Sequence, residues 1–353
     1  MLAVLTAADN ASAAGCRNPD EIRLYIPRFA GPETLARNVA TTLNLSIWPT
    51  LRRIPWPDNP DNNDFGRGTI IWDHEPLDEQ SHEFASRAAQ HPLVNAQLVL
   101  WGKAQPYGEG VAVEVNLTLP RYQDFRERRF EIWQVALPQG TVAVDLPRRR
   151  FELASIVMLP EALTHYNLPS ANLVYAEPEM QQAIGTLGDS FVGLIFEHGR
   201  AKVRVGDVIG WVQAPNLSKV HPEVIEMTAG ILRLFRCDWE GAASSMARVI
   251  SNPGTPAAVR VDAHLYRGMA LEQLGKSGRD EFEEAFALNP YSRTTIRYLV
   301  MSDLAALARQ DLAATRRQEL RERIAATLDQ HYAIFPPDDA WLDQVEHLLS
   351  SLP

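Results

Sequence analysis

The sequence HPEVIEMTAGILRLFRCDWEGAASSMARVISNPGTPAAVRVDAHLYRGMALEQLGKSGRDEFEEAFALNP, at residues 221–290, repeats one pattern twice. Small residues recur where two helices can cross closely, and aromatic residues stand beside them: Gly230, Ala242, Ala243, Gly268 and Ala285, with Trp239, Tyr266 and Phe282. Asn252-Pro253 and Asn289-Pro290 each close a unit, because proline cannot continue a helix. The stretch therefore predicts two helical hairpins inside a region, residues 218–353, that is expected to be helical throughout.

This pattern resembles the tetratricopeptide repeat, a helix–turn–helix unit of about 34 residues. Such repeats stack into concave surfaces that bind peptides or other proteins. The resemblance implies a ligand on the face of the first helices, where the candidate contact residues are Arg233, Arg236, His264 and Arg267. The later helices, expected over 292–309, 314–332 and 338–352, would continue or cap the array.

The composition of the whole chain is that of an ordinary globular protein. Its 353 residues, 46% hydrophobic and 22% charged, are enough for two or three domains. The net charge of −10 argues against a nucleic-acid partner, because phosphate binding needs a basic face. No apolar run approaches the roughly 18 residues that a membrane span requires.

Residues 1–16 are predicted to be a tail or the remainder of a signal segment. Ala11-Ser12-Ala13 satisfies the small-x-small pattern of a signal-peptidase site, although a basic start and a full apolar core are missing. One interpretation is an exported, periplasmic protein, and the alternative is an ordinary tail on a cytoplasmic one. Cys16 and Cys237 fit either interpretation. They could pair in an oxidising compartment, and Cys237 also fits a small buried residue of a helical turn.

Residues 17–148 alternate between strand and helix patterns and predict an α/β domain. Strands are expected over 22–29, 69–72, 96–102, 111–119, 129–137 and 141–144, and helices from Gly31-Pro32-Glu33 and over 78–90. Pro27-Arg28-Phe29, the strand 96–103 and the following 110–113 together resemble the amino-terminal domain of the TolB family and its flagellar outer-membrane relatives. The resemblance implies an exported interaction module without catalytic residues. No β-propeller repeats follow, so the role of TolB itself is not implied.

Residues 149–217 carry short apolar runs separated by glycines and predict a small β-barrel. The closing segment, Gly206-Asp207-Val208-Ile209-Gly210-Trp211-Val212, resembles the last hairpin of bacterial SH3-like barrels. That resemblance implies peptide or protein binding, cell-wall peptides included, with exposed aromatic side chains as the platform. Trp211 and Tyr175 are the candidate contacts. Trp211 fits a core position equally well, because an aromatic residue can fill a small barrel.

The sequence contains none of the motifs that usually mark catalysis or a cofactor. It has no phosphate loop, no dinucleotide fingerprint, no His-Glu-x-x-His and no Gly-x-Ser-x-Gly. A metal site can be drawn from His74, Glu79 and His82, since imidazole and carboxylate suit a transition ion. The simpler interpretation is a strand end followed by an acidic helix start. We therefore expect no cofactor, no metal and no enzymatic activity.

These observations predict a multidomain chain of helices and strands with three parts. An α/β domain comes first, then an SH3-like β-barrel, then a tetratricopeptide-like helical domain. The predicted function is a non-catalytic adaptor that binds a protein or peptide in the bacterial cell envelope. One alternative is a metal-dependent or cell-wall-directed enzyme accessory. Another is a cytosolic sensor or defence adaptor.

Overall fold

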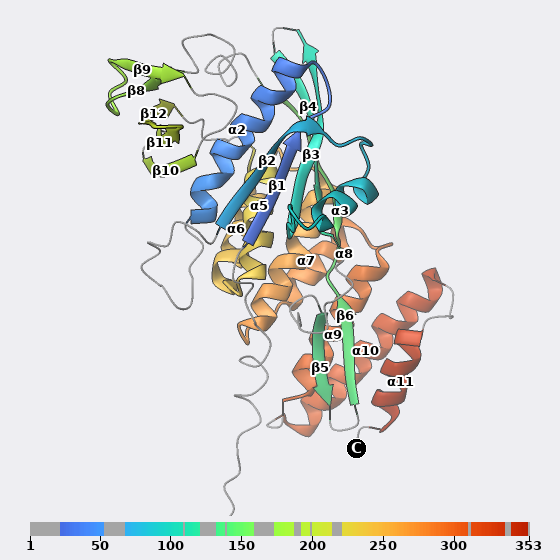
Figure 1. The fold of residues 1–353 in the computed structure, drawn as a ribbon. Coiled ribbons are helices and arrows are strands. Elements are labelled where there is room, and N and C mark those ends of the chain that lie inside the picture. Colours follow the sequence, from blue (N-terminus) through green and yellow to red (C-terminus); the bar gives the residue numbers. More distant parts are fainter. Residues whose placement is uncertain are drawn as a thin grey trace, which may run out of the picture.

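The structure is a computed structural model. It describes residues 22–52, 68–108, 110–120, 132–137, 140–158, 173–186, 192–197, 200–213, 221–309, 312–335 and 340–351. Figure 1 shows a large sheet with its own helices, a smaller sheet apart from it at the upper left, and a helical region below and behind. The mixed α and β class is confirmed. Residues 1–16, with the predicted signal segment, lie outside the described residues.

The large sheet has five strands in the order β2-β1-β3-β4-β7. Their bounds are β1 Ile22–Arg28, β2 Gly68–Pro76, β3 Leu98–Tyr107, β4 Gly110–Thr118 and β7 Arg150–Met158. β1 pairs in parallel with β2 and β3, and β4 pairs antiparallel with β3 and β7. The first four strands confirm the strand pattern expected from the sequence. Tyr107 and Gly110 flank the predicted hairpin turn between β3 and β4.

Side-chain alternation divides the residues of the large sheet between two apolar clusters. Ile22, Leu24 and Ile26 of β1 belong to the main core, which also contains the buried side chains of α2 (Glu33–Arg52). Tyr25 belongs to a second cluster with the buried alanines of α3 (His82–Gln90). Because successive strand side chains point to opposite faces, α2 and α3 cover opposite faces of the sheet. The side chain of Ser81 caps α3 by accepting a hydrogen bond from the Phe84 amide, so the helix begins four residues later than the expected 78.

β7 extends the large sheet beyond residue 148, where the sequence places the end of the first domain. Phe151, Leu153 and Ile156 of β7 are buried, and its register with β4 runs from Thr118↔Arg150 to Val111↔Met158. The apolar pattern of β7 is readable in the sequence, but its partner β4 lies more than 30 residues earlier. Local periodicity therefore could not assign β7 to this sheet.

The predicted hairpin between β4 and β7 forms, but it does not join the large sheet. β5 (Ile132–Leu137) and β6 (Gly140–Asp145) pair only with each other among the described strands. Their apolar side chains pack on the helical region: the Trp133 ring lies 5.6 Å from the ring of Tyr298 and 5.8 Å from that of Phe282, centroid to centroid. The hairpin is thus an arm of the first domain that reaches onto the helices (Figure 1).

The small sheet is antiparallel, with five strands in the order β10-β11-β12-β8-β9. The bounds are β8 Leu173–Tyr175, β9 Ala183–Thr186, β10 Val192–Glu197, β11 Arg200–Val205 and β12 Val208–Gln213. Its core consists of Val174, Ala201, Val203 and Val212. All five strands lie within residues 149–217, where the sequence predicts a small β-barrel, while closure into an SH3-like barrel stays a prediction.

The helical region confirms the expected helices. They are α5 Pro222–Phe235, α6 Trp239–Ser251, α7 Ala257–Gln273, α8 Arg279–Leu288, α9 Arg293–Leu307, α10 Ala314–Ile334 and α11 Ala340–Ser351. A Cβ atom on Gly268 would lie 2.3 Å from the Phe282 ring, so this glycine lets α7 and α8 approach closely. The close crossing matches the role the sequence assigns to its small residues. Membership in the tetratricopeptide family stays a prediction.

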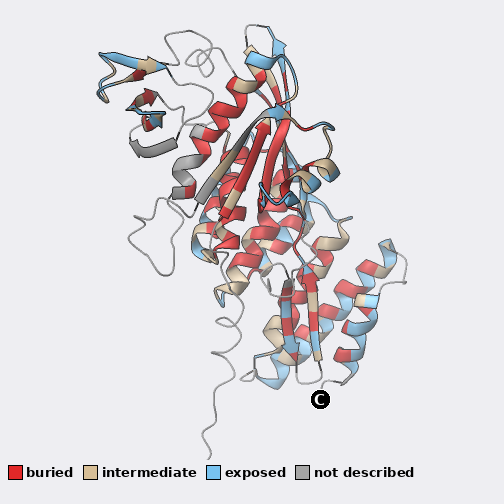
Figure 2. Ribbon diagram, viewed as in Figure 1, coloured by how far each residue is buried: buried red, intermediate tan, exposed pale blue. Residues whose placement is uncertain are grey.

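The first domain covers the face of the helical region formed by α5, α7 and α9. α2 and β7 contact α5, β7 also contacts α7, and the β5–β6 hairpin contacts α9. Every residue of α5 except Arg233 is buried, whereas α8 buries only Phe282 and Ala285. Figure 2 shows buried residues gathering along the large sheet and the helices behind it. The same core cluster runs through both domains, which therefore pack as one body.

Polar contacts also cross the junction between the first domain and the helices. The Tyr298 hydroxyl donates to the carbonyl oxygen of Asp145 at 2.8 Å, and Arg148 Nη1 donates to Asp262 Oδ2 at 3.1 Å. Burial raises the pKa of Asp262 to about 6, although the charge of Arg148 acts in the opposite direction. The first domain and the helices are thus joined by polar contacts as well as by a shared core.

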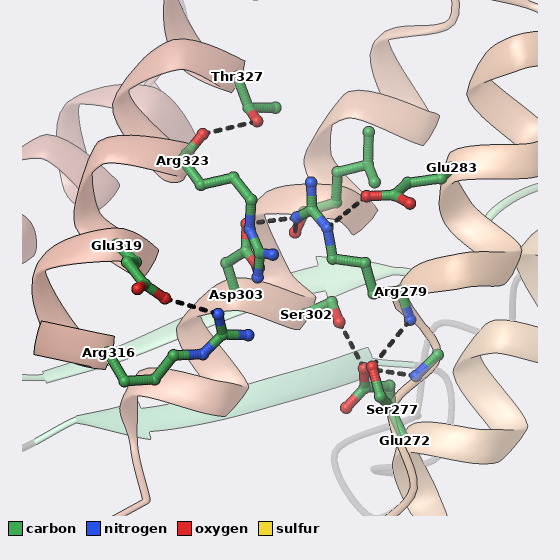
Figure 3. Close-up of polar contacts among 12 residues, drawn as sticks. Glu272, Ser277, Arg279, Glu283, Ser302, Asp303, Arg316, Glu319, Arg323 and Thr327 are labelled. Carbon is green, nitrogen blue, oxygen red and sulfur yellow. Dashed lines mark hydrogen bonds and ion pairs between the residues drawn. The ribbon is translucent and has the colours of Figure 1, made fainter. Parts of the chain in front are cut away.

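Three helices of the helical region share one buried carboxylate (Figure 3). Asp303 of α9, 1% exposed, accepts from Arg279 of α8 and from Arg323 of α10. Nearby, Ser302 Oγ donates to Glu272 Oε1 at 2.6 Å, and the Gly278 amide donates to the same oxygen at 2.9 Å. Removing one member of such a network would leave buried charges without a partner.

Candidate functional site

The small sheet places Trp211 and Tyr175 opposite each other on neighbouring strands. Trp211 of β12 is in direct register with Tyr175 of β8, and both side chains are half-buried. Directly opposed residues of an antiparallel pair point to the same face. The sheet core consists of residues at the alternate positions, among them Val174 and Val212. Trp211 therefore lies on the face away from the core, which answers the question the sequence leaves open.

Gly210 explains why the two aromatic residues can be neighbours. A Cβ atom at this position would lie 2.4 Å from Val174 Cγ1 and 2.5 Å from the carbonyl oxygen of Tyr175. Any larger residue would push β8 away from β12. The Gly-Trp-Val ending thus has a local cause: Gly210 admits β8, Trp211 stands on one face, and Val212 fills the core on the other.

A cation accompanies the aromatic pair. Lys202 of β11 is in register with Trp211, and its Nζ lies 5.9 Å from the centroid of the Trp211 ring. This is within the range at which an ammonium is attracted to an aromatic face. The face offers aromatic surface and positive charge together.

The four candidate contact residues of the helical region already have a role inside the protein. Three of them lie beside a carboxylate, and the fourth is buried. Arg233 Nη1 lies 2.5 Å from Asp238 Oδ2, where the two side chains secure the start of α6. Arg236 is buried, at 3% exposure. His264 Nδ1 and Arg267 Nη1 lie 2.9 and 2.5 Å from the two carboxylate oxygens of Glu281. Contact of these residues with a ligand stays a prediction, because their visible role is to hold α5–α8 together.

Glu281 illustrates how firmly that cluster is held. Burial alone would raise the pKa of Glu281, but its hydrogen bond with His264 and the charge of Arg267 together lower it. The carboxylate therefore stays ionised and keeps its two partners at neutral pH. This favours a structural role for His264 and Arg267.

A polar groove of about 750 Å³ lies beside the start of α3, over β3, β4 and β7. Its lining includes His82 and six charged residues, of which four lie on the strands: Lys103, Glu114, Arg150 and Glu152. The structure gives none of these four an ion pair with another described residue. The sequence does not single out this groove, because its lining comes from three strands and one helix that only the sheet brings together.

His82 is one of the titratable residues that line this groove. Its Nδ1 lies 2.8 Å from Thr118 Oγ1, which also accepts a hydrogen bond from Trp101 Nε1 at 2.8 Å. Burial lowers the pKa of His82, and the charge of Arg150 lowers it further, so the ring is neutral at neutral pH. A neutral imidazole beside a hydroxyl is the pair that nucleophilic catalysis uses. Thr118, however, is only 2% exposed, so its hydroxyl is not presented to the groove.

The candidate metal ligands lie only in part among the described side chains. Glu79 and His82 both line the groove, while the side chain of His74 lies outside the described residues. Among the residues with described positions, no group of three His, Cys, Asp or Glu side chains could hold a metal ion. Likewise, no helix in the described part of the chain is long and apolar enough to cross a membrane.

The cysteines bear on where the protein functions. Cys237, in the turn between α5 and α6, is disulfide-bonded. The chain has only two cysteines, and the other, Cys16, lies outside the described residues. Cys237 is thus not simply a small buried residue of the turn.

No protein family, curated protein or solved structure matches the chain. The resemblances to the TolB amino-terminal domain, to bacterial SH3-like barrels and to tetratricopeptide repeats stay predictions.

Proposed function

We propose that this protein is a non-catalytic adaptor that binds a protein or peptide through the outer face of its small sheet. The observation that carries the proposal is the position of Trp211, which lies opposite the sheet core and beside Tyr175. Tryptophan and tyrosine provide large contact area at low cost in side-chain entropy, and they are enriched where proteins bind one another. Among the described residues, the core of the sheet consists of Val174, Ala201, Val203 and Val212, and neither aromatic side chain belongs to it.

The arrangement of the helical region supports this choice of surface. The face of α5, α7 and α9, which in a repeat array would receive a ligand, is in contact with α2, β7 and the β5–β6 hairpin. A peptide would have to displace buried side chains such as Trp133 and Phe151. We therefore propose that the helices act as a support for the first domain, and that the ligand binds elsewhere.

The disulfide of Cys237 supports a location in the bacterial cell envelope, most simply the periplasm. Structural disulfides form and persist in oxidising compartments and are rare in the cytosol. Release of the oxidised chain from native cells by osmotic shock would agree with this location. Recovery from the cytosol with Cys237 reduced would overturn it and favour the cytosolic sensor or defence adaptor.

Site-specific photo-cross-linking tests the proposed binding surface. Tyr175 is replaced by p-benzoylphenylalanine in the full chain, and irradiation is carried out in the native cells. The matched control places the same residue at Tyr291, which is 74% exposed but lies between α8 and α9. We expect one defined cross-linked partner from position 175, none from position 291, and loss of the partner in the Trp211→Ala background.

Two results would contradict the proposal. Equal cross-linking from both positions would mean that the small sheet has no preferred partner. A partner captured from position 175 regardless of Trp211→Ala would mean that the aromatic pair is not the contact. The variant His82→Ala, which changes the groove, serves as a further control and should leave cross-linking from position 175 unchanged. Loss of the cross-linked partner in this variant would favour the enzyme-accessory alternative.

A further inference from the structure

The outer face of the small sheet combines its aromatic pair with basic residues. We use the term outer face for Tyr175, Arg200, Lys202, Arg204, Ile209 and Trp211. Strand pairing joins Lys202 to Trp211 and Arg204 to Ile209, and Trp211 in turn to Tyr175. Arg200 shares this face because it lies two positions before Lys202 on the same strand. The intervening positions, Ala201 and Val203, belong to the core.

This face is accessible. Ile209 is 48% exposed and Arg204 is exposed, while Lys202, Trp211 and Tyr175 are half-buried. The exposed isoleucine lies two positions before Trp211 on β12, so the apolar and aromatic residues lie beside the positive charges of β11. Such a combination is typical of surfaces that bind another molecule.

The charges of the outer face stand out against the rest of the chain. The protein carries a net charge of −10, yet all three charged residues of β11 are basic. Neither Lys202 nor Arg204 forms an ion pair with a side chain that the structure describes. Glu197, the last residue of β10, is in register with Arg200, whereas Glu177, Glu179 and Asp207 lie in turns. Positive charge therefore concentrates at Lys202 and Arg204 of β11, beside Trp211 and Ile209 of β12.

We propose that the outer face binds an acidic polypeptide segment in an extended conformation. This inference rests on the proposed function and names the chemistry of its partner. Lys202 and Arg204 are two residues apart on one strand, which separates their Cα atoms by roughly 6.6 Å. An extended ligand repeats its own side chains at the same interval, so carboxylates at alternate positions would meet both cations. An apolar side chain beside them would rest on Trp211 and Ile209.

Binding of synthetic peptides to the full chain tests this inference. The probe is a fluorescein-labelled peptide of alternating glutamate and serine with one central leucine, followed by fluorescence anisotropy. A peptide with lysine in place of every glutamate is the control ligand. We expect the acidic peptide to bind and the basic one not to bind, and we expect affinity to fall as salt is raised.

Charge-reversal variants locate the interaction. Lys202→Glu and Arg204→Glu should each weaken binding of the acidic peptide by roughly fivefold or more, because a cation near the ligand becomes an anion. Lys276→Glu makes the same change in charge at an exposed position after α7 and should leave the affinity unchanged. Trp211→Ala should weaken binding at every salt concentration, because aromatic contact is little affected by screening.

The outcomes separate this inference from the proposed function. Equal binding of acidic and basic peptides, or equal losses in Lys202→Glu and Lys276→Glu, would overturn the acidic partner. The photo-cross-linked partner can also be tested in the charge variants. If it is retained in Lys202→Glu and Arg204→Glu but lost in Trp211→Ala, the adaptor proposal stands and the inference of an acidic ligand fails. If cross-linking from position 175 fails as well, both proposals fall together.

Discussion

The face of the helical region formed by α5, α7 and α9 and the outer face of the small sheet are the two surfaces at which the sequence predicts a ligand. The first is covered by the chain's own α2, β7 and β5–β6 hairpin. The second keeps Trp211 and Tyr175 half-exposed and Ile209 exposed. The comparison teaches that a surface whose sequence pattern predicts ligand binding can instead pack against another part of the same chain. Substitutions on the first surface should therefore affect folding, and those on the second should affect binding.

The largest expected effect follows from Asp303→Asn in the helical region. The substitution leaves Arg279 and Arg323 facing a neutral side chain in a buried position, which should cost about 3–5 kcal/mol of unfolding free energy. Urea denaturation followed by circular dichroism measures the loss. Glu319→Gln, which removes an exposed pair with Arg316 in the same view (Figure 3), should cost under about 0.5 kcal/mol. Similar losses in both variants would show that Asp303 does not organise these helices.

A smaller effect, dependent on pH, is expected at the junction between the first domain and α7. The folded-state pKa of Asp262, about 6, lies above its ordinary value of 3.8. The folded state therefore binds a proton more tightly than the unfolded state between these values. The stabilisation that the protonated Asp262 carboxyl provides is present below about pH 4 and is lost as the pH rises through 6. The difference between the two pKa values corresponds to about 3 kcal/mol of unfolding free energy, since each pKa unit is worth about 1.4 kcal/mol.

Asp262→Asn isolates this contribution. The variant should gain about 3 kcal/mol of stability relative to the wild type between pH 4 and pH 7, because it never ionises. Chemical denaturation of both proteins across this pH range measures the difference. If the variant instead becomes the less stable one at pH 7, the ion pair with Arg148 outweighs the burial of the carboxylate, and the sign of our argument is wrong.

The smallest effect on stability is expected on the outer face. Trp211→Ala removes a large side chain that the core does not use and should cost about 1 kcal/mol or less. Val212→Ala removes a much smaller group, but one that is 1% exposed, and should cost about 2 kcal/mol. Hydrogen exchange of the β11 and β12 amides compares the two. A greater loss for Trp211→Ala would place this tryptophan in the core and remove the basis for the binding surface.

Much of the secondary structure could be predicted from local pattern. The helices α9, α10 and α11 and the strands β1 and β4 lie within a few residues of their expected positions, because apolar periodicity reports directly on the local backbone. The boundary at residue 148 is different. β7 has a clear alternation of its own, yet its membership of the large sheet depends on pairing with β4, which periodicity does not encode.

The candidate sites divide in the same way. The sequence names Trp211 and Tyr175 as candidate contacts through its resemblance to SH3-like barrels, but the pairing of their strands is visible only in the structure. The groove around His82 was missed as a groove, because Lys103, Glu114 and Glu152 meet only through the register of β3, β4 and β7. Only its metal-ligand pattern, with Glu79 and His82, gave a signal in the sequence.

The sequence by itself determined which face of each element is apolar and where charge lies along β11, because these properties follow from the order of residues and the geometry of a helix or strand. Only the tertiary structure decided which of those faces are covered. α5, α7 and α9 receive the first domain, while the outer face of the small sheet keeps its aromatic and basic residues accessible. The physical reason is that burial depends on contacts between distant segments, and a periodic pattern identifies a face without naming its partner.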